Sequence, residues 1–196
     1  MYYYNERFRT QYHSRRKEKI QWIVVHYTGT AASATANARA IEKELKDPRS
    51  THYFVDGEQV LAVVPENRSA WHVGGPDKPD TPPEKRKKLP VYNGNAIGVD
   101  LCEDKLVYDR EHRSVKDADW YFDELTEATA AELIASIMRR YSIDLDHVVR
   151  HYDVTGKWCP RPFVGDDMNH VYKETGNQRW REFKALIETY LNGGIA

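Results

Sequence analysis

Apolar and polar residues follow strand-like and helix-like periods in successive segments of the chain. The near-continuous apolar run Ile20-Gln-Trp-Ile-Val-Val-His26 is typical of a strand in the centre of a sheet. Residues 52–56 and 59–64 predict a hairpin with its turn at Asp56-Gly57. Residues 96–102 and 148–151 predict two further strands.

Three segments have the period of an amphipathic helix. Ser33 is placed to cap a helix through about Lys46, which Asp47-Pro48 ends. The clearest helix opens at Thr126, and a last one ends before Gly193-Gly194. The inward positions are Ala36, Ala40, Ile41 and Leu45 in the first helix, Ala130, Leu133, Ile134, Ile137, Met138 and Tyr141 in the second, and Trp180, Phe183, Ile187, Tyr190 and Leu191 in the last. Strands alternating with helices predict an α/β fold, with a central mixed sheet and helices packed on its faces.

Length and charge set the broad class. A chain of 196 residues fits one domain with one sizeable core. Lys and Arg total 29 against 30 Asp and Glu, so no global charge favours nucleic acid or a membrane surface. No apolar run approaches the roughly 20 residues that cross a bilayer, so we expect no membrane insertion. Residues 1–19 hold six Lys or Arg and no apolar signal segment, which predicts a basic N-terminal arm before a domain over residues 20–196.

Two long segments fit no regular element. Residues 77–94 contain four prolines and the basic run Lys85-Arg-Lys-Lys88, and residues 105–119 are dominated by charge. Loops of this length in a compact domain are usually functional or mobile. The first segment is interpreted either as a rim of a substrate groove or as a solvated insertion.

Three side chains have the chemistry of metal ligands. His26 ends the buried strand, and His151 and Cys159 follow far downstream, close to each other in the sequence. A structural zinc is normally closed by four protein ligands, whereas a catalytic zinc has three and keeps one position for water or substrate. Three candidates therefore favour a catalytic zinc. A Cys102–Cys159 disulfide is the alternative, but Cys102 lies in an apolar run and is better explained as a small buried residue.

Four short blocks around these residues occur in the order typical of one enzyme family. The blocks are Ile23-Val-Val-His26-Tyr-Thr, Ser50-Thr-His-Tyr-Phe-Val-Asp56 followed by Ala70-Trp-His-Val-Gly74, Asn95-Ala-Ile-Gly-Val-Asp100, and Arg150-His151 with Lys157-Trp-Cys-Pro160. In these blocks the chain resembles the zinc-dependent N-acetylmuramoyl-L-alanine amidases of the peptidoglycan-recognition-protein-like superfamily, in particular the catalytic domains of phage endolysins and bacterial autolysins. The resemblance implies an α/β domain with Zn²⁺ in a surface cleft, bound by His26, His151 and Cys159.

The resemblance also implies roles for the residues that would act beside the metal. Lys157 would stand next to it and stabilise the oxyanion that develops when a carbonyl is attacked. Some relatives carry a tyrosine as general base where this chain has Thr51, whose hydroxyl is too weak an acid to replace it. Others carry an acidic residue where this chain has Asp100, so Asp100 is the predicted base and Glu103 the second candidate.

Three aromatic side chains are predicted to form the walls of the substrate groove. They are His52, Trp71 and His72, which lie in the second family block. Aromatic faces suit contacts with a sugar or a stem peptide.

The implied reaction is hydrolysis of the amide between N-acetylmuramic acid and L-alanine of the stem peptide in bacterial peptidoglycan. A protein made in the bacterial cytoplasm without a signal peptide would then act on the wall after release, as a phage or prophage lysin does. Two alternatives stay open: a recognition module that binds without cutting, and a zinc peptidase acting within the stem. Cys159 argues against the first, because non-catalytic members lack the cysteine ligand. The sequence assigns no oligomeric state.

Overall fold

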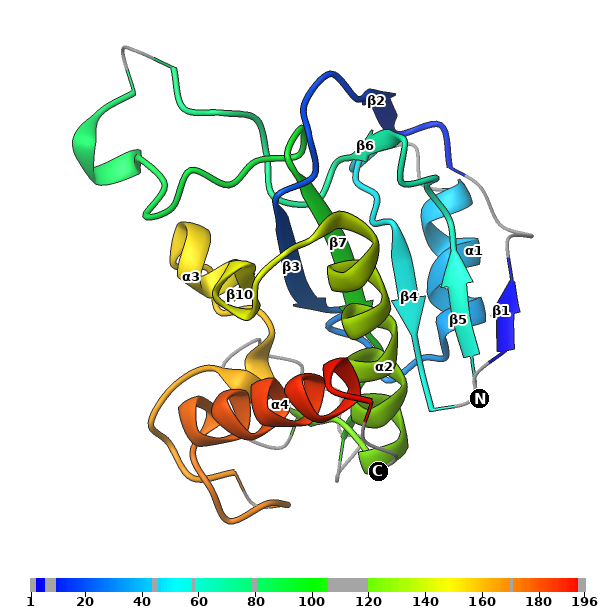
Figure 1. Cartoon of the computed structure of the whole chain (residues 1–196), viewed down its shortest axis with the longest axis vertical. Helices are drawn as coiled ribbons and strands as arrows, with labels where there is room; N and C mark the ends of the chain where they lie inside the picture. Colours follow the sequence, from blue (N-terminus) through cyan, green and yellow to red (C-terminus); the bar gives the residue numbers. More distant parts are fainter. Residues whose placement is uncertain are drawn as a thin grey trace.

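The structure is a computed structural model that describes residues 3–5, 10–43, 46–57, 59–78, 81–105, 120–169 and 171–193. Its centre is a six-stranded sheet in the order β1-β5-β4-β7-β3-β10 (Figure 1). Only the β4–β5 pair of this sheet is antiparallel. The strands of the sheet are β1 Tyr3–Asn5, β3 Trp22–Tyr27, β4 Tyr53–Val55, β5 Gln59–Ala62, β7 Ala96–Leu101 and β10 Val148–Arg150.

The remaining elements surround this sheet. Two small antiparallel pairs join β2 (His13–Arg15) to β6 (Arg68–Ala70), and β8 (Asp104–Lys105) to β9 (Trp120–Tyr121). The α-helices are α1 Ala34–Lys43, α2 Glu124–Tyr141, α3 His151–Thr155 and α4 Gly176–Leu191. Short 3-10 helices cover Pro83–Lys85 (η1), Leu145–His147 (η3) and Arg161–Phe163 (η4).

The two faces of the sheet are covered differently, because side chains alternate along each strand. On one face, Val25, Tyr53 and Val99 pack against α2 and α4 in the main core. On the other face, α1 covers Phe54 and Leu61 in a smaller cluster. A third cluster, formed by Val24, Val73, Val91, Ala96, Val149 and Val154, covers the β3–β10 side of that face. The predicted fold class, a mixed sheet with helices on its faces, is confirmed.

Several predicted boundaries differ from the observed ones. Helix α2 begins at Glu124 rather than Thr126, because the Asp123 carboxylate accepts the Thr126 backbone N–H at 2.8 Å and caps the helix. Tyr141, predicted to face the core, is exposed at the end of this helix, where its hydroxyl donates to Glu66 Oε2 at 2.7 Å. The strand predicted over residues 148–151 ends at Arg150, and His151 begins α3.

The basic N-terminal segment belongs to the folded domain in the part that the structure describes. Strand β1 pairs with β5 in the main sheet, and β2 pairs with β6. Between β2 and β3, the Arg16 guanidinium donates to the carbonyl oxygens of Glu66, Arg68, Gly94 and Ala96 at 2.7–3.0 Å. The described parts of residues 1–19 therefore lie against the domain, and the division at residue 19 stays a prediction. Most of the charged segment 105–119 lies outside the described residues.

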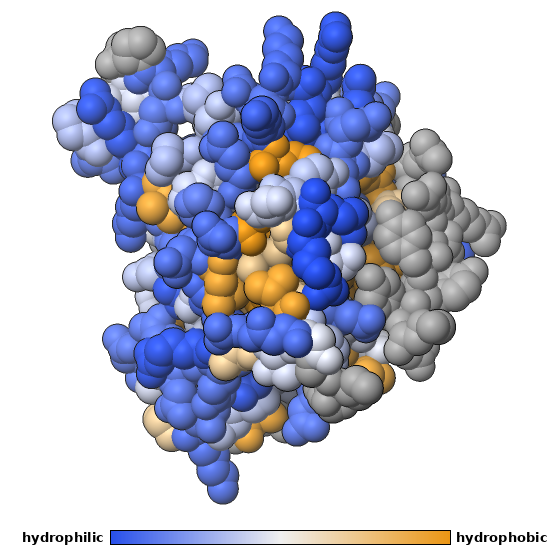
Figure 2. All heavy atoms as spheres, viewed as in Figure 1, coloured by the Kyte–Doolittle hydropathy of each residue, from blue (hydrophilic) through white to orange (hydrophobic). Residues whose placement is uncertain are grey.

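None of the described helices combines the length and apolarity needed to cross a membrane. Figure 2 shows a mainly hydrophilic face on which apolar side chains gather in small patches.

Candidate metal centre

The site lies on the α1 face of the sheet, between the two smaller core clusters. His26 in β3 and Asp100 in β7 are direct neighbours across a parallel strand pair, and Phe54 in β4 is the next neighbour of Asp100. Paired residues of adjacent strands share a face of the sheet, so these three side chains form a row near the carboxyl ends of the strands. In open α/β sheets this end of the strands is where ligands bind.

His151 reaches the same place through the neighbouring strand. Arg150, the last residue of β10, pairs with Val25. The next residue, His151, therefore lies level with His26. Arg150 fixes the start of α3, since its side chain and backbone N–H both bind the Asp153 carboxylate and its guanidinium donates to the Phe163 carbonyl at 2.6 Å.

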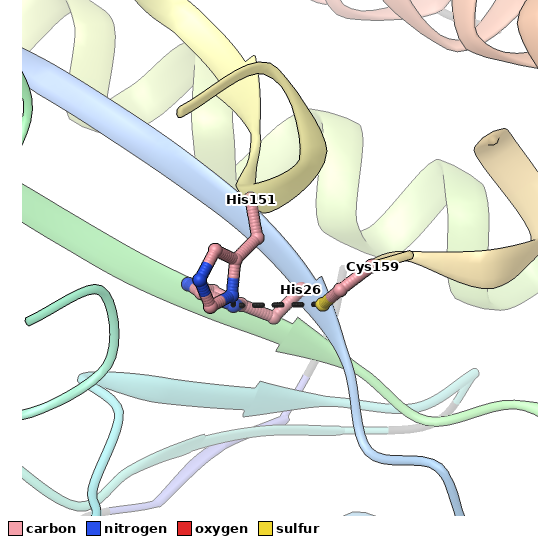
Figure 3. A group of neighbouring side chains, drawn as sticks. All are labelled: His26, His151 and Cys159. Atoms are coloured by element: carbon pink, nitrogen blue, oxygen red, sulfur yellow. Dashed lines mark hydrogen bonds between the residues drawn. The ribbon is translucent and has the colours of Figure 1, made fainter. Parts of the chain in front are cut away.

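A tight loop after α3 returns Cys159 to His151. Gly156 ends the helix with φ +80°, a conformation that favours glycine. The Tyr152 N–H donates to the Cys159 carbonyl at 2.8 Å, and the Cys159 N–H donates to the Lys157 carbonyl at 2.7 Å. These bonds close the loop beside the first turn of α3, and the thiol then points toward the two imidazoles (Figure 3).

The three ligand atoms have the spacing that a zinc ion requires. His26 Nδ1 lies 3.1 Å from His151 Nδ1 and 3.7 Å from Cys159 Sγ. Tetrahedral zinc with Zn–N bonds of about 2.05 Å and a Zn–S bond of about 2.3 Å would separate two nitrogens by about 3.3 Å and a nitrogen from the sulfur by about 3.6 Å. Both contacts agree with these values, and all three atoms lie within 4.8 Å of one another. The donor set therefore fits zinc.

The protonation states of the three candidate ligands also suit metal binding. Burial holds the pKa of His26 well below its usual range, and the neighbouring His151 and His72 lower it further. Burial, followed by the charges of Lys157 and Lys87, lowers the pKa of His151 to about 4. Both imidazoles are thus neutral near pH 7, as ligation requires. Burial raises the pKa of the Cys159 thiol, so the charge of a bound cation is what would displace its proton.

A cavity of about 390 Å³ opens over the group. The ligands, Asp100 and Lys157 line one part of it together with Trp71 and His72. Helix α1, the loop after it, the end of β3 with its following turn, and β4 line the rest. The further lining residues are Tyr27, Thr28, Thr30, Asn37, Ala40, Ile41, Asp47, Arg49, Ser50, Thr51 and Phe54. The arrangement places Lys157 and Asp100 with the three ligands around a space large enough for part of a polymer substrate.

The comparisons with known proteins assign this chain to a family. Residues 16–162 match the family model described as N-acetylmuramoyl-L-alanine amidase. The chain belongs to this amidase family. N-acetylmuramoyl-L-alanine amidase CwlL of Bacillus licheniformis is 32% identical over 155 residues, which cover 75% of this chain and 38% of that protein. XlyB of Bacillus subtilis, an amidase of the same name, is 30% identical over 179 residues, or 90% of this chain and 44% of that protein.

Solved structures of the same kind share the fold of this amidase-family chain. The catalytic domain of XlyA is 25% identical with a TM-score of 0.62, and the match covers 94% of this chain and 98% of that one. A mutant endolysin from Bacillus subtilis is 25% identical with a TM-score of 0.64, covering 95% and 99%. The chain spans less than half the length of CwlL and XlyB.

Asp100 and Lys157, the residues with predicted roles in the reaction, both line the cavity. Burial raises the pKa of the Asp100 carboxyl to about 7, while the Thr51 hydroxyl and the charges of Lys157 and Arg49 oppose the rise. A carboxyl with this pKa is suited to gain and lose a proton near neutral pH. Lys157 is exposed on the loop between His151 and Cys159, at the rim of the cavity.

Two other predicted residues do not line the cavity. His52 is fully buried, with Nδ1 accepting the Gly98 N–H at 3.0 Å and Nε2 lying 3.1 Å from the Arg68 carbonyl oxygen. Its place in the wall of the groove is therefore not supported. Glu103 is also buried, and its Oε2 accepts both the backbone N–H of Thr28 at 3.0 Å and its hydroxyl at 2.8 Å. Glu103 fixes the turn after β3 and does not face the metal ligands.

The residues that sequence reasoning missed come from the α1 side of the cavity. Arg49 and Asp47 form an ion pair of 2.8 Å at its edge, and Asn37 lines it from α1. Arg49 directly precedes the second family block, and that adjacency is the signal that could have identified it. In the segment 77–94, Lys87 donates to the carbonyls of Val73 and Val91 and so ties this loop to the Trp71–His72 segment, but no described residue of 77–94 lines the cavity.

Proposed function

We propose that this chain is a zinc-dependent peptidoglycan hydrolase that cleaves the amide between N-acetylmuramic acid and the L-alanine of the stem peptide. The observation that carries the proposal is the buried group of His26, His151 and Cys159, with zinc-like spacing, at the base of an open cavity. Membership of the amidase family and relatives named N-acetylmuramoyl-L-alanine amidase support the choice of bond.

The zinc ligands, Lys157 and Asp100 have separate roles around the scissile amide. Bound at the three ligands, zinc supplies Lewis-acid polarisation of the carbonyl and lowers the pKa of water. The Lys157 ammonium faces the same space and stabilises the negative charge that develops on the carbonyl oxygen. The Asp100 carboxylate accepts a proton from the attacking water and delivers it to the leaving nitrogen of L-alanine.

Trp71 forms a wall of the site for the substrate. Its indole is half-buried at the cavity, packs at a tilt against Tyr12 with ring centroids 5.8 Å apart, and donates through Nε1 to Ser14 Oγ at 2.9 Å. These contacts hold a flat aromatic face in one orientation. Such a face suits a sugar ring or the apolar part of a stem peptide.

Cys159 favours hydrolysis over simple recognition of the wall. A recognition module needs the cavity but not a third ligand, and here the thiol is buried 3.7 Å from His26 Nδ1, a separation that suits two ligands of one zinc ion. We further propose that the protein acts on the bacterial wall as a phage or prophage lysin, since one structural relative is an endolysin.

Analysis of wall digests tests the bond that is cut. Purified protein is incubated with bacterial walls, and the released fragments are examined by mass spectrometry and end-group labelling. We expect new L-alanine amino termini, free glycan strands and no new reducing sugar ends. New reducing ends would identify a glycosidase, and new termini within the stem would identify a peptidase; either result would contradict the proposal.

A further inference from the structure

The nitrogen of His26 that faces away from the other ligands has its own partner. His26 Nδ1 faces His151 and Cys159, while His26 Nε2 lies 3.0 Å from Nδ1 of His72. The two rings meet edge-on, with an interplanar angle of 86°. The His26 imidazole is buried and His72 is half-buried, so the contact lies in the wall of the cavity.

Two ring nitrogens at this distance share one hydrogen. When His26 Nδ1 binds a metal, the only ring proton of the neutral imidazole is on Nε2. His26 is then the donor, and His72 accepts with an unprotonated Nδ1. The hydrogen bond fixes both the tautomer and the ring orientation of His26, which are the two properties a histidine ligand needs before the metal arrives.

The backbone of His72 is itself fixed by a distant side chain. Asn93 Oδ1 accepts the backbone N–H groups of His72 at 3.0 Å and Val73 at 2.8 Å. The Asn93 N–H in turn donates to the Gly74 carbonyl at 2.8 Å. The side chain and the backbone of Asn93 therefore together hold the segment that carries His72 in place.

The sheet beneath His72 leaves room for its ring. Gly98 lies in β7 on the same face as Asp100, and a Cβ atom there would stand 2.8 Å from both Cγ and Nδ1 of His72. Contacts this short do not occur, so any larger residue at this position would push the imidazole away. Gly98 has no left-handed backbone conformation that would otherwise explain a glycine in the middle of a strand.

We propose that His72 is a positioning residue for the metal ligand His26, seated over Gly98 and clamped by Asn93. This inference rests on the proposed function and assigns His72 a task other than contact with the glycan or the stem. Its loss should weaken zinc binding about 10- to 100-fold, the effect typical of removing the partner of a histidine ligand.

His52 offers a matched control within the same cluster. Its ring centroid lies 5.7 Å from that of His72, and it is fully buried. Its nitrogens, however, contact Gly98 N, the Arg68 carbonyl and Arg16, and they make no contact with His26. Replacing His52 removes a buried imidazole that has no hydrogen bond to either ring of the proposed pair.

The test compares zinc affinity in variants of the full chain by competition with a chromophoric chelator. His72→Leu removes the acceptor, whereas His72→Asn places an amide oxygen near the position of Nδ1. We expect a 10- to 100-fold higher Kd for zinc with leucine, a Kd within about threefold of wild type with asparagine, and an unchanged Kd for His52→Asn. A wild-type Kd for His72→Leu, or an equal loss in all three variants, would overturn the inference.

A second measurement does not depend on zinc binding or on folding of the leucine variant. Nitrogen-15 chemical shifts of the imidazoles in the metal-free protein report which nitrogen of each ring carries the proton. We expect His26 protonated at Nε2 in wild type and a mixture of tautomers in Gly98→Ala, where the His72 ring is displaced. An Nδ1-protonated His26 in wild type would refute the inference, whereas failure of the wild-type protein to bind zinc would refute the proposed function instead.

Discussion

Replacing Asp100 by asparagine should damage activity and stabilise the fold at the same time. As a proton-transfer group, Asp100 contributes about 10²- to 10⁴-fold to turnover, and the amide of Asp100→Asn cannot accept a proton. As a half-buried carboxyl, however, it destabilises the metal-free protein whenever it is ionised. Both effects come from the position of one side chain beside the ligands.

The size of the stabilisation follows from the raised pKa. The difference between the ordinary value of 3.8 and about 7 in the folded protein corresponds to about 4 kcal/mol. The cost to folding is absent while the carboxyl is protonated in both the folded and the unfolded chain, below the ordinary pKa of 3.8. Stability is lost as the pH rises from there, and the loss is complete once the pH has passed about 7. Because Asp100 retains some contact with solvent, about 4 kcal/mol is the upper limit.

Urea denaturation of the metal-free proteins at pH 5 and pH 8 measures this effect. Asp100→Asn should be the more stable protein at pH 8, by a margin that shrinks toward pH 5. Turnover on wall fragments should fall by the factor given above, with zinc occupancy retained. The activity of wild type should decline as the pH drops below the pKa of Asp100, which bound zinc would shift to below about 7.

Two results would refute this reasoning. Equal stability of the two proteins at pH 8 would show that the Asp100 carboxyl is not held in an unfavourable environment. Unchanged turnover in Asp100→Asn would remove its role as the base.

Three further substitutions probe other parts of the site and its support. Lys157→Ala should lower kcat on wall fragments about 10²- to 10³-fold with zinc content unchanged, and a loss confined to KM would exclude oxyanion stabilisation. Glu103→Gln should keep turnover within a few-fold of wild type, because Glu103 faces Thr28 rather than the cavity; a loss of more than 100-fold would make Glu103 the base. Arg16→Ala should cost about 3 kcal/mol in urea denaturation, because four carbonyl oxygens lose a charged donor, and wild-type stability would contradict the structural role of the N-terminal segment.

Local sequence patterns predicted the elements that bring the ligands to the site. The apolar run before His26 predicted its strand, and the short separation of His151 and Cys159 in the sequence agrees with their meeting at one site. The helical spacing of the apolar positions also predicted the face of α2 that packs on the sheet, except at Tyr141. That residue lies at the helix end, where a hydrogen bond to Glu66 is available instead of the core.

Contacts between residues far apart in the sequence determine the features that local patterns did not predict. His52 and His72 stand in similar aromatic blocks, yet one is bound by backbone groups of β7 and the other contacts His26. The difference depends on Gly98, whose missing side chain makes room for His72 and whose N–H binds His52. Arg16 is comparable, because its partners lie some 50 to 80 positions further along the chain, and a local reading of a basic segment predicts only solvent exposure.

The zinc content and turnover of Cys159→Ser, measured beside wild type, test the central claim most directly. Native mass spectrometry should find one zinc per wild-type chain. In Cys159→Ser it should find most of the metal lost, because a serine hydroxyl does not replace the thiolate at the position 3.7 Å from His26 Nδ1, and turnover on wall fragments should fall with it. Full zinc content together with wild-type turnover in this variant would contradict the account.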